Sequence, residues 1–108
     1  MGDVRAVDPL IGRLGDDSRC VRAAACEALG SFGDARAVEA LIGRLGDEDS
    51  DVRRAACVAL RELGDARAVD PLIALLEDGR RRDRRVACAA LGELGDARAV
   101  EPLIGRLG

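Results

Sequence analysis

Residues 33–63 read GDARAVEALIGRLGDEDSDVRRAACVALREL, and this 31-residue stretch decides the fold because the rest of the chain repeats it. Residues 2–32 and 64–94 align with it position by position, and residues 95–108, GDARAVEPLIGRLG, match its first half. A fixed period of about 20–50 residues is typical of a solenoid, in which no unit buries its apolar face alone. We therefore expect a single domain, residues 1–108, built of units 2–32, 33–63 and 64–94 and the half-unit 95–108.

Each unit is expected to form two helices. The apolar residues of its first half recur at i, i+3, i+4 and i+7, which is one stripe of an α-helix; in the second unit they are Val38, Leu41, Ile42 and Leu45. The period then places first helices near 4–14, 35–45, 66–76 and 97–107, and second helices near 19–31, 51–63 and 82–94. The predicted fold is all-α, a short right-handed α-solenoid of seven helices in three and a half 31-residue repeats.

The ends of the first helices carry their own signals. Asp34 is a plausible N-cap in the second unit. The prolines, Pro9, Pro71 and Pro102, predict a distorted first turn, with the regular helix beginning near each proline. Gly15 and Gly46 follow the last leucine and suit the left-handed residue that often ends a helix.

A helical wheel separates two faces of the second helix of the second unit. The face predicted to be buried carries Val52, Ala56, Ala59, Leu60 and Leu63. The opposite face carries Asp51, Arg54, Val58 and Glu62, and is expected to be open.

The composition excludes much catalytic chemistry. The chain has no His, Lys, Asn, Gln, Thr, Tyr or Trp, so an imidazole base, a Schiff-base amine and a phenol are all missing. Its net charge of −3 gives no overall attraction to nucleic acid or anionic lipid. No apolar run reaches the roughly 18 residues of a membrane span, and the opening residues Met-Gly-Asp-Val-Arg do not have the character of a signal peptide. We expect a cytoplasmic protein that is not an enzyme, with no catalytic residues, cofactor or metal.

The repeated motifs resemble those of a known family. Asp-x-Arg-Ala-Val-Glu-Pro-Leu-Ile, an acidic turn and Val-Arg-x-x-Ala-x-x-Ala-Leu together resemble the HEAT-like repeats of the phycobilisome-lyase type. The chain is even more similar to artificial alpha-helical repeat proteins built from that consensus. The resemblance covers all 108 residues. Several positions depart from the pattern. Ala40 replaces a proline, Arg61 replaces the glycine present at Gly30 and Gly92, and Gly12, Gly43 and Gly105 stand where the family usually has a good helix former.

The resemblance implies that the second helices line a concave surface and that their outward positions bind protein targets. In the first unit those positions are Arg19, Cys20, Ala23, Ala24, Glu27 and Ser31. In the second unit they are Ser50, Asp51, Arg54, Ala55, Val58 and Glu62. In the third unit they are Arg81, Arg82, Arg85, Val86, Ala89 and Glu93. For the second unit, the wheel gives most of the same set independently.

The four cysteines are not expected to form a disulfide or a metal site. Cys26, Cys57 and Cys88 repeat at the same position, so neighbours should lie about 8–10 Å apart, as packed helices do. A disulfide needs Cα atoms closer than about 7 Å, and one zinc ion needs every sulfur about 2.3 Å away. We expect these three to be buried, reduced thiols. Cys20 is expected on the open face.

Arginines recur with the period. Arg22, Arg53 and Arg84 form one series, and Arg5, Arg36, Arg67 and Arg98 form another. Repetition in every unit indicates a structural role, in which the guanidinium groups bond helix ends and acidic turns across units.

The run Arg80–Arg85 is the one strong charge cluster, and we interpret it as a solvated loop at a helix start. An acidic protein partner is the alternative, while the absence of a stacking aromatic side chain disfavours nucleic acid. Asp83 within it aligns with Val21 and Val52, both expected on the buried face. We expect Asp83 to cap the helix start, partly solvated and near an arginine, because a buried unpaired carboxylate costs several kcal/mol.

The function that fits best is a non-enzymatic scaffold that binds a protein partner on the concave surface. Two alternatives stay open: a bilin-lyase-like component, and a self-assembling repeat block, whether a natural fragment or a design.

The first helix leaves one flank of Val7, Leu10, Ile11 and Leu14 without a preceding unit, and the last helix has no second helix. Uncovered apolar ends favour association, and a two-fold contact is the commonest symmetry. We therefore expect a homodimer through one end, the C-terminal half-unit.

Overall fold

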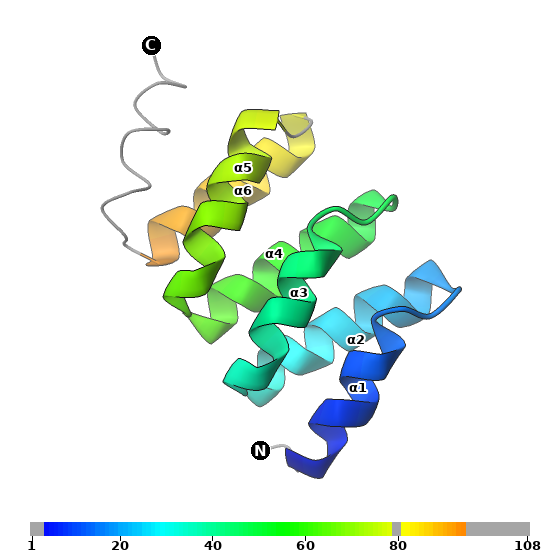
Figure 1. Cartoon of the computed structure of the whole chain (residues 1–108). Helices are drawn as coiled ribbons and strands as arrows, with labels where there is room; N and C mark the ends of the chain where they lie inside the picture. Colours follow the sequence, from blue (N-terminus) through cyan, green and yellow to red (C-terminus); the bar gives the residue numbers. More distant parts are fainter. Residues whose placement is uncertain (1–3, 79–80, 95–108) are drawn as a thin grey trace.

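A computed structural model describes residues 4–78 and 81–94, and over that range the chain contains six α-helices and no strand (Figure 1). The first helices are α1 (Val7–Arg13), α3 (Val38–Arg44) and α5 (Val69–Asp78). The second helices are α2 (Arg19–Phe32), α4 (Ser50–Leu63) and α6 (Arg81–Leu94). The all-α repeat fold is therefore confirmed. The seventh helix, expected near 97–107, lies outside the described residues, as does the half-unit on which the homodimer expectation rests.

The helix pairs stack side by side (Figure 1). Helices α1, α3 and α5 form one layer, and α2, α4 and α6 form the other. Within the second layer α2 packs on α4 and α4 packs on α6, while each first helix packs on its own second helix. The second layer therefore carries most of the contacts between units.

Each first helix begins with a short 3-10 turn. These turns are η1 (Val4–Ala6), η2 (Ala35–Ala37) and η3 (Ala66–Ala68). The Asp34 and Asp65 carboxylates accept the backbone N–H of the residue two positions on, at 2.9 Å in both cases. The distorted first turn was predicted from the prolines, yet η2 precedes α3, where Ala40 stands in place of proline. The aspartate cap, present in both units, therefore accounts for the turn.

Two of the second helices, α2 and α4, also have side-chain caps. Ser18 caps α2 through its hydroxyl, and Asp49 caps α4 by accepting two backbone N–H groups. Both helices end at a glycine in the left-handed conformation, Gly33 with φ 69° and Gly64 with φ 64°. The expectation of left-handed Gly15 and Gly46 is wrong. At Gly46 the chain turns through a hydrogen bond from Asp47 N–H to the Arg44 carbonyl, 3.1 Å long, which needs no positive φ.

The apolar stripes meet in one continuous core. Residues fully or almost fully buried in the second unit include Val38, Leu41, Val52, Ala56, Ala59 and Leu60. Leu63 is half-buried, at the edge of the face that the wheel assigned to the core.

The N-terminal end of the stack differs from the expectation in two ways. Val7 and Leu14 are buried rather than uncovered, because α2 packs against α1, and Leu10 and Ile11 are half-buried. Val21, in contrast, is 37 % exposed although Val52 at the same repeat position is fully buried. This position faces the preceding unit, since Asp83, the third member of the series, bonds to Arg53 of the second unit. Val21 belongs to the first unit, and no helix that the structure describes covers it from that side.

Gly30 marks the closest approach between second helices. A methyl group added at Gly30 would lie 2.8 Å from the Cα of Ala59 and 2.7 Å from Oε1 of Glu62. A methyl group added at Gly92, the equivalent position in α6, would meet nothing within 4 Å among the residues that the structure describes. Gly30 therefore lets α2 and α4 pack with their backbones close together, a requirement that is absent at Gly92.

We predict opposite effects for the same substitution at these two positions. Gly30→Ala should lower the free energy of unfolding by about 1–3 kcal/mol, because the α4 backbone must move away. Gly92→Ala should raise it by about 0.5–1 kcal/mol, because alanine restricts the unfolded chain and fits the helix. Urea unfolding followed by circular dichroism measures both. Equal effects of the two substitutions would contradict the close approach at Gly30.

Candidate functional site

The open face of two successive second helices forms a groove of about 500 Å³. Helix α2 contributes Ala23, Glu27 and Ser31, and α4 contributes Asp51, Arg54, Ala55, Val58 and Glu62. All eight residues belong to the predicted outward positions, but Ala55 is buried rather than open, at 8 % exposure, and forms part of the floor. We call this depression the α2–α4 groove. The structure brings these residues together, while their role in binding stays a prediction.

The remaining predicted residues lie around the groove or along its continuation. Arg19 and Cys20 are exposed at the start of α2, with Ala24 exposed one turn further on, and Ser50 is half-buried at the start of α4. On α6, Arg85, Ala89 and Glu93 are exposed and occupy the repeat positions of Arg54, Val58 and Glu62. Val86 is half-buried against the core rather than open. Arg81 and Arg82 begin α6, and their side chains are outside the described set.

The α2–α4 groove combines a small apolar floor with a charged rim. Ala23, Ala55 and Val58 provide the floor. Arg54 lies 3.8 Å from Asp51 of the preceding turn, an exposed pair of small energetic value. Glu62 reaches toward α2, because its carboxylate is the nearest atom to a methyl group placed on Gly30.

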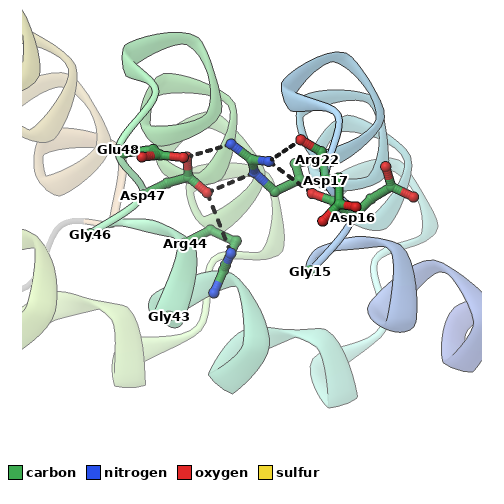
Figure 2. A pocket seen from close by; sticks show the side chains of 9 residues that line it. All are labelled: Gly15, Asp16, Asp17, Arg22, Gly43, Arg44, Gly46, Asp47 and Glu48. Carbon is green, nitrogen blue, oxygen red and sulfur yellow. Dashed lines mark hydrogen bonds and ion pairs between the residues drawn. The ribbon is translucent and has the colours of Figure 1, made fainter.

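A second depression, of about 410 Å³, lies where the interhelical turns of the first two units meet (Figure 2). Arg22 spans it: Nε and Nη2 donate to the two carboxylate oxygens of Asp47, at 3.0 and 3.2 Å. Its Nη1 donates to the carbonyls of Asp16 and Asp17, at 2.8 and 3.1 Å. Arg44 adds bonds to the Leu14 carbonyl and to Asp47. The predicted structural role of this arginine series, bonding acidic turns across units, is confirmed for Arg22.

These contacts stabilise the charged forms of both partners. The hydrogen bond to Asp47 raises the pKa of Arg22. At Asp47, burial opposes ionisation, but hydrogen bonds from the backbone N–H of Asp49 and from Arg22 outweigh it and lower the pKa below its ordinary value of 3.8. No buried side-chain nitrogen or oxygen among the described residues lacks a hydrogen-bond partner. The buried polar groups of this depression are thus engaged with one another, and we interpret it as a bridge between units.

Arg53 repeats the bridge with a different partner. Its Nη1 donates to the Asp47 carbonyl at 2.7 Å, and its Nε donates to the Asp83 carboxylate at 2.9 Å. Asp83 is 5 % exposed and is the third residue of α6. The expectation that it lies near an arginine is confirmed, while the expectation of a partly solvated cap is wrong. The burial is tolerated because Arg53 of the preceding unit supplies the opposite charge.

The second arginine series ties the layer of first helices together. Arg36 bonds Asp34, and Arg67 bonds Asp65, at 3.0 and 3.1 Å. These hydrogen bonds are the largest cause of the lowered pKa values of both aspartates. Arg67 also donates to the Ala35 carbonyl of the preceding unit at 3.2 Å. Unit-to-unit hydrogen bonds therefore occur in both layers.

The cysteines divide by position. Cys26 and Cys57 are free and fully buried, and burial raises their pKa to about 11 and about 12. Cys20 is exposed, as expected. Cys88 is only partly buried, which corrects the expectation for this third thiol. Cysteines at this repeat position face the following unit, because the charge of Arg44 affects the pKa of Cys26 and the charge of Asp83 affects the pKa of Cys57. No helix after α6 is described that would cover Cys88 in the same way.

We predict that Asp83→Val destabilises the protein by about 3 kcal/mol, because it leaves the Arg53 charge buried without its carboxylate. The double variant Arg53→Met/Asp83→Val should recover most of the loss, since an apolar pair replaces an ionic one. Urea unfolding of the parent and both variants measures this. An Asp83→Val protein as stable as the parent would show that the pair contributes nothing.

The lowered pKa of Asp47 predicts acid sensitivity. The ionised carboxylate contributes stability that is fully present above its ordinary value of 3.8 and is lost as the pH falls through the lower folded-state pKa. Asp47→Asn should therefore be less stable than the parent at about pH 6 and should lose less stability between about pH 5 and pH 2. Urea midpoints across this range measure the effect. Parallel pH profiles of the parent and variant would contradict it.

None of the described helices is long and apolar enough to cross a membrane.

No curated protein matches the sequence. The profile of HEAT repeats matches residues 7–91 and, in a second alignment, residues 42–108. Together these matches span most of the chain, and the stacked helix pairs described above are the architecture that the profile implies. The chain belongs to the HEAT repeat family.

Proposed function

We propose that this protein is a non-enzymatic scaffold that binds a partner protein through the α2–α4 groove and its continuation on α6. HEAT repeats commonly serve as scaffolds for protein interactions. The observation that carries the proposal is the groove itself, in which outward residues of two successive second helices line one depression. The depression of Figure 2, in contrast, is occupied by hydrogen bonds between its own residues.

The rigidity of the second layer supports this role. Helices α2 and α4 are locked by the close approach at Gly30 and by the Arg22–Asp47 bridge. A surface held in place by buried contacts loses little conformational freedom when a partner docks. The alanine and valine floor adds little side-chain entropy to that cost. The helices thus present a fixed pattern of side chains to a partner.

The test uses one substitution inside the groove and one outside it. Val58→Arg places a long charged side chain on the groove floor, and Ala74→Arg places the same side chain on an exposed position of α5. A phage-displayed library of natural protein fragments is selected on the parent protein, and the enriched fragments are then measured on both variants. We expect Val58→Arg to weaken binding at least about tenfold, because it fills the groove, and Ala74→Arg to leave binding unchanged.

The proposal is wrong if selection enriches no fragment, or if the enriched fragments bind Val58→Arg as well as they bind the parent. Circular dichroism of both variants verifies that each remains helical.

A further inference from the structure

We propose that the α2–α4 groove takes a cationic segment of a partner protein, whose arginine or lysine side chains pair with Glu27 and Glu62 around a small apolar residue on Val58. This inference rests on the binding role proposed above and adds the chemical class of the partner.

The first argument is the charge of the groove lining. Its ionisable side chains are Glu27, Asp51, Glu62 and Arg54, so the net formal charge is −2. Asp51 and Arg54 lie 3.8 Å apart and offset each other. The uncompensated charge therefore resides on Glu27 and Glu62.

The second argument is that these glutamates lack cationic partners. Neither Glu27 nor Glu62 forms an ion pair with any residue that the structure describes, and the same holds for Glu93, the counterpart of Glu62 on α6. The layer of first helices is different. Its carboxylates lie within 4 Å of an arginine at Asp8, Asp34, Glu39 and Asp65. Arginine is abundant in this chain, so the α2–α4 groove carries negative charge that no described arginine neutralises.

The third argument is that helix stability does not account for this charge. Glu62 and Glu93 lie in the last turns of α4 and α6, where the negative end of the helix dipole disfavours a carboxylate. Their placement thus costs a small amount of folding stability. A cationic side chain bound across the groove would remove that cost.

The size of the groove limits what it admits. A volume of about 500 Å³ falls within the range of roughly 300–1,000 Å³ typical of small-ligand pockets. It therefore holds a few side chains of an extended segment. Ala23, Ala55 and Val58 suit a small apolar residue between the charged ones, and a guanidinium forms two parallel hydrogen bonds with a carboxylate.

The experiment measures binding of a short fluorescein-labelled peptide in which arginine alternates with alanine. Two peptides of the same length, with glutamine or glutamate in place of arginine, serve as probe controls. Fluorescence anisotropy is recorded for the parent, for Glu27→Gln/Glu62→Gln and for a matched control, Glu48→Gln/Glu77→Gln. The control removes the same number of exposed carboxylates outside the groove, so it corrects for the overall charge of the protein.

We expect the arginine peptide to bind the parent at least about tenfold more tightly than the glutamine peptide, and the affinity to fall as salt is added. Glu27→Gln/Glu62→Gln should lose that advantage, and Glu48→Gln/Glu77→Gln should keep it. Equal binding of the three peptides, or an equal loss in the two double variants, would overturn the inference.

The library selection on the parent separates this inference from the proposed function. Enriched fragments that are sensitive to Val58→Arg but acidic or uncharged would support the groove as a binding site and overturn its preference for cations. A nucleic acid that binds the groove in competition with the arginine peptide would also overturn it.

Discussion

The contact between successive second helices is the constraint on which the rest of the structure depends. The first helix of a unit covers only part of the apolar surface of the second helix. The neighbouring second helices cover the rest, so α4 packs against α2 on one side and against α6 on the other. Gly30 allows α2 to approach α4 closely, and it lies against the small Ala59. The side chains opposite this contact are left on the open face, so the packing of the second layer also determines which residues line the α2–α4 groove.

Buried arginines make that packing specific in geometry. Arg22 donates to two carbonyls of an interhelical turn and Arg53 donates to one, and each also donates to a carboxylate of the following unit. An ion pair of this kind contributes less net stability than its distance suggests, because both groups lose hydration. Its geometry is specific, however, since a shift of one unit against the next would leave a buried charge unpaired. We infer that the arginines fix the register in which apolar contact holds the units together, and hence the shape of the groove.

Much of this architecture could be predicted from the sequence, because repetition makes each position visible several times. The period located the six described helices, and one helical wheel placed Asp51, Arg54, Val58 and Glu62 on the open face. Some misses are local, such as the left-handed conformation expected at Gly15 and Gly46, but others concern contacts with a neighbouring unit. Asp83 is buried by Arg53, about 30 residues earlier, and Val21 is exposed because no described helix covers the side of the first unit on which it lies. The apolar pattern within one unit predicts neither the burial of Asp83 nor the exposure of Val21. The sequence likewise could not predict that Glu27 and Glu62 lack an ion pair, because that depends on where the arginine side chains of neighbouring helices lie.

The most direct test of the account is native-state hydrogen exchange of α2 and α4 in increasing denaturant. If these helices are stable mainly through each other, the slowest backbone amide protons of both should exchange with the same free energy and the same denaturant dependence, as one cooperative unit. The result that would contradict the account is stepwise loss, in which α2 exchanges at a much lower free energy while α4 keeps its full protection.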